Sequence, residues 1–338
     1  MSSMKSDDWD EFVRSAGDCT VYHLRQWGTL LEEVHGHKLV YLGKDKGIFP
    51  LAQVRSAIFG NRLISLPFAD YGGPYAQDEE TTEELISECQ ERAQQLGVDF
   101  IEVRCPDARY SEVLEKSGFV KRDDYLTFVL RLDTKIEELW KNIGEKKRKK
   151  VRKAERSGIH TVEVTDKADL KGFYVLYQKT MKRLGSPPQP YRFFERMWDL
   201  LYPRNMTIFL VRYEGDYIAG KLVFLHNSTI YQGYNPSLRE YYQLAPNDLV
   251  QWDLIKWGNK HGFRQLHFGR TRKGEGPELF KQQWGGESVS MPYFYKFYNK
   301  ELNYRQEVRY RWLSAFWSKY MPELIANWAG PWIIKQIG

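Results

Sequence analysis

The chain has 338 residues, enough for two ordinary domains, and its 42% hydrophobic and 15% aromatic content is that of a globular protein. It has no run of about 18 apolar residues, so no transmembrane helix is predicted, and its N-terminus lacks the apolar stretch of a signal peptide. The three cysteines, Cys19, Cys89 and Cys105, show no CxxC spacing and predict neither a zinc site nor a disulfide framework. We therefore expect a cytoplasmic protein without a metal or a resident cofactor.

The first half of the chain alternates between strand and helix patterns. Residues 9–35 have a mixed helical pattern, and the Gly- and Pro-rich segment 67–76 is expected to be a loop. Alternating or β-branched apolar patterns predict strands at 38–41, 47–58, 62–66, 100–103 and 126–132. Apolar positions three and four residues apart, closed by glycine, predict helices at 81–96 and 110–117.

The second half repeats this order. Strands are predicted at 160–164, 206–213, 217–225, 229–234, 265–268 and 290–298, and helices at 170–184, 192–201, 247–261 and 277–283. This is the order of an acyltransferase-type α/β sheet, so we expect two related α/β halves in tandem. The predicted boundaries are 1–133 and 159–300 for the two domains, 134–158 for a basic helical connector and 301–338 for a helical, aromatic tail. The tail either packs over the domains or makes a peripheral membrane contact through its tryptophans.

The connector is the most basic part of the chain. Residues 141–156 contain nine Lys and Arg against two Glu, and this net charge of +7 exceeds the +6 of the whole protein. We expect one helix that begins near Asp133. Its basic part, EKKRKKVRKAERSG, has only Val151 and Ala154 as apolar residues, too few for it to pack like a core helix. The segment is either a solvated arm or a surface for a polyanion such as tRNA, a phospholipid surface or an anionic polysaccharide, and we favour the polyanion. The residues assigned to this surface are Lys146, Lys147, Arg148, Lys149, Lys150, Arg152 and Lys153.

A second group of cations follows the predicted strand at 265–268. The segment HFGRTRKGEGPELFKQQWGG has a glycine-broken loop and then a helical turn. Its cations are Arg270, Arg272, Lys273 and Lys281. Such a loop suits a phosphate or pyrophosphate, although a solvated surface loop would have the same composition. Lys182 and Arg183, at the end of another predicted helix, either complement its dipole or reach toward a phosphate or carboxylate.

The chain resembles the FemAB-related transferases, also called BioF2-like acetyltransferases, in KKVRKAERSGI, TMKRLGSPPQPYRFF and FGRTRKGEGPELFKQQWGG. The resemblance covers about residues 10–335, is densest from 146 to 298, and is strongest to the branch associated with exopolysaccharide and PEP-CTERM sorting systems. It implies two GNAT-like domains. In the better-known members, a peptidoglycan precursor accepts an amino acid from aminoacyl-tRNA.

The resemblance also implies roles for individual residues. Arg183 and Lys281 match positions that are implicated in holding the diphosphate of the precursor. The loop LPFADYGGP resembles the loop that borders the substrate channel, and Asp70 matches an acidic position there. His267 stands where members of the branch commonly carry Asp, which argues against an acid/base role for this position.

The acyl donor is expected to differ from that of ordinary GNAT acetyltransferases. Those enzymes hold the CoA pyrophosphate with a Q/R-x-x-G-x-G/A loop that opens a helix. The equivalent stretch, 235–252, has no glycine and contains Pro246, so aminoacyl-tRNA or another activated acyl group is favoured over acetyl-CoA.

Attack of an amine on an ester requires deprotonation of the amine and a stabilised oxyanion. Asp70 is the candidate base, and Tyr71 or Tyr234 the candidate proton donor. Each of these side chains suits a structural role equally well. No Ser/His/Asp or Cys/His arrangement predicts a covalent acyl-enzyme.

We therefore expect an acyl- or aminoacyltransferase that acts on an amine of a phosphate-bearing cell-envelope or polysaccharide precursor. Arg183, Arg270 and Lys281 would bind the phosphate, with Tyr71 and Lys182 also contacting the substrate. A non-catalytic polyanion-binding module and an N-acetyltransferase that uses acyl-CoA are the alternatives.

Overall fold

The computed structural model describes residues 6–57, 59–105, 110–299, 321 and 323–337. Contacts divide the chain into two units. Unit 1 contains the chain up to Tyr125 and two later segments that begin at Ser290 and Trp328; unit 2 contains residues 126–289 and 317–327. Each unit is built on one mixed sheet with helices, which confirms the predicted α/β class.

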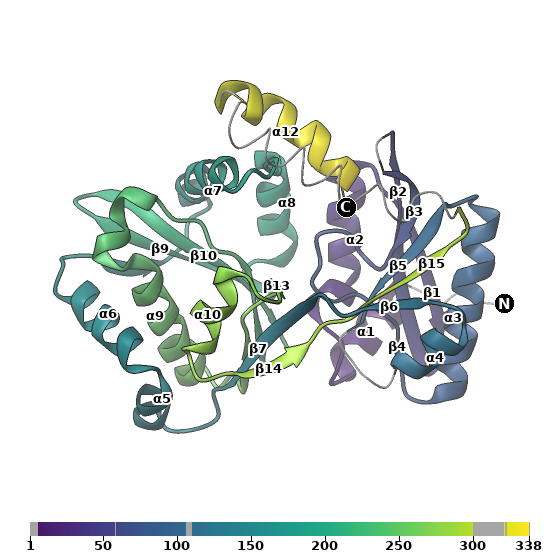
Figure 1. Cartoon of the computed structure of the whole chain (residues 1–338), viewed down its shortest axis with the longest axis horizontal. Coiled ribbons are helices and arrows are strands. Elements are labelled where there is room, and N and C mark those ends of the chain that lie inside the picture. Colours follow the sequence, from purple (N-terminus) through teal and green to yellow (C-terminus); the bar gives the residue numbers. More distant parts are fainter. Residues whose placement is uncertain (1–5, 58, 106–109, 300–320, 322, 338) are drawn as a thin grey trace. The chain divides into compact units, whose positions relative to one another are not determined.

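The sheet of unit 1 has the strand order β1-β2-β3-β5-β15-β6, with β4 paired to β2. Its strands are β1 (Lys38–Lys44), β2 (Gly47–Ser56), β3 (Gly60–Ile64), β4 (Tyr75–Ala76), β5 (Phe100–Arg104), β6 (Val120–Arg122) and β15 (Tyr293–Phe297). The helices α1 (Ser6–Ser15) and α2 (Arg25–His35) lie on one side of the sheet, and α3 (Glu79–Gln95) and α4 (Ser111–Lys116) on the other (Figure 1). A short 3-10 helix, η1 (Val21–His23), precedes α2.

Helix α3 shows how the apolar pattern produces this packing. Leu85, Ile86, Cys89 and Ala93 are buried on one side of the helix, as their spacing predicts. The helix begins two residues before the predicted start because the Asp78 carboxylate accepts a hydrogen bond from the backbone N–H of Thr81 at 2.9 Å.

The sheet of unit 2 has the strand order β13-β7-β12-β11-β10-β9-β8, with β14 paired to β7. Its strands are β7 (Tyr125–Arg131), β8 (His160–Glu163), β9 (Met206–Tyr213), β10 (Asp216–His226), β11 (Thr229–Tyr234), β12 (Gln265–His267), β13 (Thr271–Arg272) and β14 (Glu287–Ser290). The helices are α5 (Ile136–Asn142), α6 (Glu145–Glu155), α7 (Leu170–Leu184), α8 (Tyr191–Leu201), α9 (Pro246–Lys260) and α10 (Gly276–Gln282), with 3-10 helices η3 (Lys167–Asp169) and η4 (Arg239–Leu244). Helices α7 and α8 cover one face of this sheet and α9 covers the other (Figure 1).

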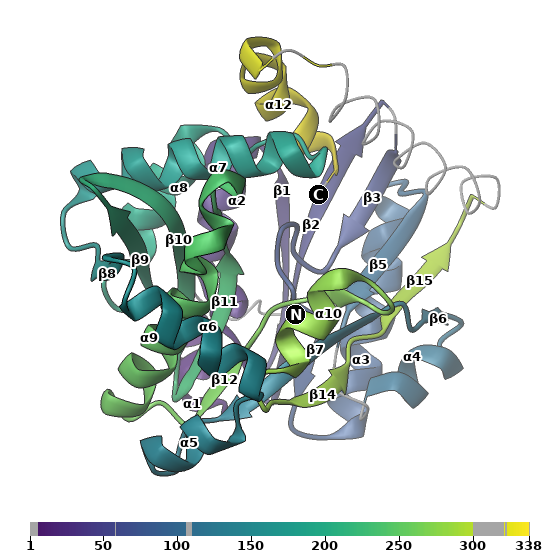
Figure 2. The ribbon, with the colours of Figure 1, turned by 60° about the vertical axis from the view of Figure 1, so that its left-hand side comes forward.

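Two strands pair differently from the prediction. We assigned 126–132 to the first half as its final strand, but β7 pairs with β12, where Leu130 lies opposite Leu266. The strand predicted at 290–298 is β15, which lies between β5 and β6 of unit 1, and not in the second half (Figure 2). The apolar pattern predicted the strands, but it does not specify which edge each strand joins.

The connector also differs from the prediction. The single helix expected from Asp133 is two helices, because α5 ends at Asn142 and α6 begins after Gly144. Helix α6 is not a solvated arm, since Lys147, Val151 and Ala154 are buried and the helix packs on α9. The three buried positions are spaced i, i+4 and i+7, so they form one stripe along the helix.

The C-terminal helix α12 (Glu323–Ile337) ends against unit 1. The buried Arg62 guanidinium donates hydrogen bonds to the carbonyls of Gln336 (2.5 Å) and Ile337 (2.8 Å), and His37 Nε2 donates to that of Lys335 (3.0 Å). These bonds satisfy carbonyls that a helix end leaves without partners. Most of the predicted aromatic tail, including Tyr310, Trp312 and Trp317, lies outside the described residues. No helix in the described part of the chain is long and apolar enough to cross a bilayer.

Gly258 offers a test of the packing of α9 on its sheet. A Cβ there would lie 2.6 Å from Ile230 Cδ1 and 2.9 Å from Leu132 Cδ1. We expect Gly258→Ala to lower the free energy of unfolding by about 1–3 kcal/mol through overpacking, as measured by urea denaturation. Gly276→Ala is the matched control because a Cβ there meets nothing within 4 Å. Equal stability of the two variants would contradict this packing.

Candidate functional site

The cationic loop after β12 is held closed by its own lysine. Lys281, in the last turn of α10, donates hydrogen bonds to the carbonyls of Gly269 (2.7 Å) and Arg270 (3.2 Å). The hydroxyl of Thr127, on β7, donates to the same Gly269 carbonyl at 3.2 Å. Gly269 has φ +72°, a conformation that glycine adopts without strain. Lys281 therefore sets the shape of a loop whose Arg270 side chain is exposed.

Arg183 lies on α7 and contacts η4. It is exposed in the last turn of α7, and its guanidinium carbon lies 5.8 Å from the ring centroid of Tyr242 in η4. Helix α7 ends at Gly185, and both Lys182 and Arg183 lie where cations complement the helix dipole. A phosphate site that combines Arg183 with Lys281 remains a prediction.

The segment between β11 and α9 uses its backbone groups internally. The N–H of Ser237 donates to Thr180 Oγ1 at 3.0 Å, and that of Leu238 donates to the Ile218 carbonyl at 2.9 Å. Helix α9 then begins at Pro246, which has no N–H, and carries the buried carboxylate of Asp248 in its first turn. A pyrophosphate requires open backbone N–H groups and no competing anion at this helix end. In the described segment, Ser237 and Leu238 use their N–H groups internally, Pro246 has none, and the Asp248 carboxylate lies in the first turn of the helix.

The Asp248 carboxylate forms an ion pair with a buried lysine from α6. Lys147 is 2% exposed, and its Nζ lies 2.7 Å from Asp248 Oδ1 and 3.4 Å from the ring centroid of Phe280 on α10. Burial lowers the pKa of Lys147, and the Asp248 carboxylate opposes this shift. Lys147 is thus a structural cation, and its assignment to an external polyanion was wrong. Arg148 also makes internal bonds, to the carbonyls of Lys141 (2.7 Å) and Ile143 (2.6 Å).

The remaining cations of α6 stay on its outer side. The exposed members of the predicted polyanion set are Lys146, Lys149, Lys150, Arg152 and Lys153. All five are exposed, and Lys150 Nζ also lies 3.9 Å from Asp248 Oδ2, so a polyanion would meet the outer surface that these cations form.

A second buried lysine was missed by the sequence analysis. Lys221, on β10, is 4% exposed, and its ammonium donates to the side-chain oxygens of Asn235 (2.6 Å), Gln232 (3.0 Å) and Gln251 (3.0 Å). These three bonds match the three N–H donors of the ammonium. Burial lowers the pKa of Lys221 to about 7, with a smaller contribution from Lys281. The sequence signal was a lone lysine within the otherwise apolar run IAGKLVFL.

The loop of unit 1 that carries Asp70 and Tyr71 is also held by a buried cation. Arg104 Nη1 donates to the carbonyl of Ala69 at 2.9 Å, and Arg104 Nε donates to Glu102 at 2.8 Å. Asp70 is half-buried and Tyr71 is buried, with its ring stacked on that of Tyr22. The loop is therefore a fixed structure, and the catalytic role of Asp70 stays a prediction.

Tyr234 and His267 belong to aromatic groups in unit 2. The Tyr234 ring meets Phe194 edge-on at 5.2 Å and Tyr177 at 5.5 Å. Burial lowers the pKa of His267 to about 4, and its ring lies 4.9 Å from that of Tyr231. His267 is therefore neutral at pH 7. Tyr234 as a proton donor remains a prediction.

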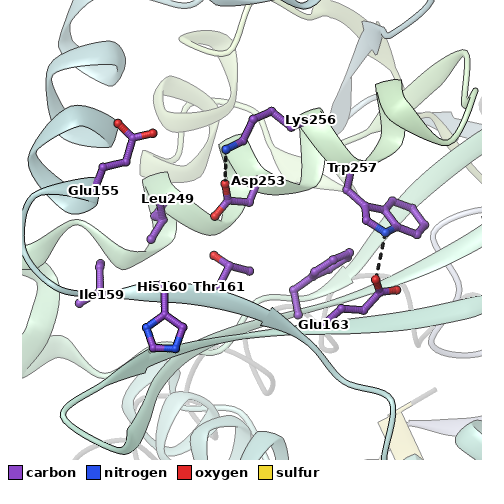
Figure 3. Close-up of a pocket in the computed structure, with 10 residues that line it drawn as sticks. Glu155, Ile159, His160, Thr161, Glu163, Leu249, Asp253, Lys256 and Trp257 are labelled. Carbon is purple, nitrogen blue, oxygen red and sulfur yellow. Dashed lines mark hydrogen bonds and ion pairs between the residues drawn. The ribbon is translucent and has the colours of Figure 1, made fainter.

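A separate cavity of about 470 Å³ lies beside α6, β8 and α9 (Figure 3). Two pairs of its polar groups bond each other: Lys256 pairs with Asp253 at 2.7 Å, and Trp257 Nε1 donates to Glu163 at 3.1 Å. The cavity contains none of the predicted site residues.

The buried Lys147–Asp248 pair can be tested by substitution. Lys147→Ala leaves Asp248 buried, with Lys150 Nζ as a more distant cation at 3.9 Å. We expect the free energy of unfolding to fall by about 3–5 kcal/mol in urea denaturation. Lys149→Ala, on the exposed side of the same helix, should change it little. A small effect of Lys147→Ala would show that the pair does not stabilise unit 2.

Lys221 makes stability depend on pH. Its pKa in the folded protein, about 7, lies below the ordinary value of 10.5, so between these values the unfolded chain binds the extra proton. The Lys221 contribution to the free energy of unfolding must therefore rise as the pH increases from about 7 toward 10.5. Lys221→Met should remove this contribution, which denaturant titrations at pH 7 and pH 9.5 would measure. Identical pH dependence in the two proteins would contradict the lowered pKa.

Comparisons with known proteins agree with this fold. Residues 144–282 match the family described as "Acetyltransferase (GNAT) domain". A lipid II:glycine glycyltransferase of Staphylococcus aureus is 23% identical over 248 residues, which cover 50% of this chain and 58% of that protein. One from Staphylococcus haemolyticus is 28% identical over 89 residues, or 24% of this chain and 21% of that protein. This chain therefore spans between about a fifth and three fifths of these curated relatives.

Three solved structures share the architecture. The crystal structure of FemX has a TM-score of 0.71 at 18% identity and covers 89% of this chain and 98% of that chain. The structure of L-PGS from Bacillus licheniformis has a TM-score of 0.61 at 13% identity, with 94% and 98% covered. A tandem GNAT protein from the clavulanic acid biosynthesis pathway has a TM-score of 0.52 at 12% identity, with 75% and 79% covered. The protein thus has a tandem GNAT-like fold, and residues 144–282, which match the GNAT family, lie in its second unit.

Proposed function

We propose that the protein is an aminoacyl- or acyltransferase that modifies an amine of a phosphate-bearing cell-envelope precursor. The observation that carries this proposal is the segment between β11 and α9. There the N–H groups of Ser237 and Leu238 are bonded internally, and a carboxylate stands at the start of α9. A GNAT-type domain with this arrangement favours a donor other than acyl-CoA.

The names of the curated relatives suggest the class of acceptor. The curated proteins that share up to half of this chain are named lipid II:glycine glycyltransferases. Lipid II is our model acceptor, and an aminoacyl-tRNA is our model donor. The finer assignment to an exopolysaccharide or PEP-CTERM-associated branch belongs to the proposal, as does a location at the cytoplasmic face of the membrane.

The loop at 267–284 is the proposed phosphate-binding wall. Lys281 ties the loop to the carbonyls of Gly269 and Arg270, and the exposed Arg270 side chain extends from it. Arg183 is a second exposed guanidinium of the same unit. Guanidinium groups suit phosphate because their planar fork donates two parallel hydrogen bonds.

The proposed reaction needs few protein groups. Asp70 is the proposed base for the attacking amine and Tyr234 the proposed proton donor, with Tyr71 and Lys182 beside the substrate. The exposed cations on the outer side of α6 are proposed to contact the phosphates of the tRNA. A polyanion-binding module without catalysis is the second candidate, because this outer surface does not by itself require turnover.

A transfer assay tests the proposal. The protein is incubated with tRNA charged with labelled amino acids and with lipid II, and the labelled lipid is separated by chromatography. We expect transfer by the unaltered protein and at least a tenfold lower kcat/KM for lipid II in two variants. Arg183→Ala loses a charge-assisted contact with the substrate, and Lys281→Ala releases the loop that carries Arg270. Acetyl-CoA should not raise the Tm.

Lys179→Ala is the matched control, because Lys179 is an exposed cation on the same helix as Arg183. It should transfer at the unaltered rate. Equal losses in Lys179→Ala and Arg183→Ala would refute the proposed role of Arg183. Absence of transfer with every charged tRNA, together with retained tRNA binding, would favour the binding module.

A further inference from the structure

A cavity of about 430 Å³ in unit 1 is lined mainly by basic residues. It lies where the end of α2, the strands β1 and β2, and the end of α12 meet. Its lining residues are His35, Gly36, His37, Lys38, Gln53, Arg55 and Lys335. None of them is acidic, so within the described part of the chain no carboxylate lines the cavity to offset the three cations, Lys38, Arg55 and Lys335.

These three cations have no ion pair among the residues that the structure describes. Lys38 lies directly opposite Gln53 in the β1–β2 register, and Arg55 is two residues farther along the same strand. Lys38 and Arg55 therefore occupy diagonal positions on one face of the sheet, where like charges repel. Both side chains are exposed. An anion between them would relieve this repulsion.

The third cation, Lys335, lies in the last turn of α12, which is anchored by hydrogen bonds. The carbonyls of Lys335, Gln336 and Ile337 are bound by the buried side chains of His37 and Arg62, at distances between 2.5 and 3.0 Å. This anchoring holds the last turn of α12 against β1 and β3, so Lys335 is held in place without an anion. Burial, with smaller contributions from Arg62 and Lys335, lowers the pKa of His37 to about 4, while its bond to the Lys335 carbonyl opposes the shift. His37 is therefore a neutral anchor at pH 7.

Cations that approach from β1, β2 and α12 suit a tetrahedral oxyanion. A phosphate group can accept hydrogen bonds from three separate directions, and the fork of Arg55 can bind two of its oxygens. A planar carboxylate uses such a three-sided arrangement less well. We propose that this cavity, between Lys38, Arg55 and Lys335, binds the phosphate group of an inorganic phosphate, a phosphate monoester or a lipid headgroup.

An exposed tryptophan bears on the source of the phosphate. Trp332 precedes Lys335 by three residues in α12, so the two side chains emerge on the same side of the helix, and Trp332 is 60% exposed. An indole next to a cation is a common arrangement at the headgroup level of a membrane. If the phosphate belongs to a lipid headgroup, Trp332 should therefore contribute to membrane binding.

Calorimetric titration with inorganic phosphate in a chloride buffer tests the site. We expect saturable binding that Arg55→Gln weakens about tenfold or more, because one charge-assisted contact is lost. Lys121→Gln is the matched control, since it removes an exposed cation from β6 of the same unit, away from the cavity. Binding that is unaffected by Arg55→Gln, or weakened equally by both substitutions, would overturn the proposal, as would no saturable binding.

Sedimentation with vesicles then distinguishes the sources. If the ligand is a lipid headgroup, the protein should sediment with vesicles that contain phosphatidic acid and not with pure phosphatidylcholine. Trp332→Ala should then reduce sedimentation without changing the affinity for inorganic phosphate. If the protein binds phosphate but sediments with neither vesicle, the ligand is a soluble phosphate. The site uses none of the residues proposed for transfer, so failure of either proposal leaves the other standing.

Discussion

The buried ion pair between Lys147 and Asp248 is the constraint on which the second unit depends. A lysine and an aspartate that are both nearly inaccessible must stay paired, because an unpaired buried charge is strongly destabilising. The pair joins α6 to the first turn of α9, and the ring of Phe280 brings α10 to the same ammonium. The pair thereby allows α6, which has few apolar residues, to pack in the core of unit 2.

The same pair constrains the chemistry. The first turn of α9 is the helix end at which a GNAT domain would be expected to receive a pyrophosphate, and here it carries the buried Lys147–Asp248 ion pair. Of the preceding residues, Ser237 and Leu238 donate their N–H groups to α7 and β10. Exposed cations of the unit lie on the outer side of α6 and in the loop tied by Lys281, among other places.

Much of the local structure was predictable from the sequence. The helices at 81–96, 170–184 and 247–261 were predicted to within a few residues, because each has an apolar stripe and a recognisable end. The absence of glycine between 235 and 245 was also visible. The partners of β7 and β15 were not predictable, since an apolar alternation is the same whichever strand lies beside it. The cavity at the end of α12 was hidden for a similar reason: Lys38, Arg55 and Lys335 are close only in the folded chain.

The sequence by itself determined the α/β class, the order of the elements and the concentration of cations at 141–156 and 270–281. These features depend on periodicity and composition, which act over a few neighbouring residues. Only the tertiary structure decided what each cation does. Lys147 and Lys221 are buried and bonded, Lys281 closes its own loop, and Lys149 and Lys153 are exposed. The local sequence does not show whether a lysine will be buried or exposed. Its function depends on whether folding places hydrogen-bond acceptors or water around its ammonium.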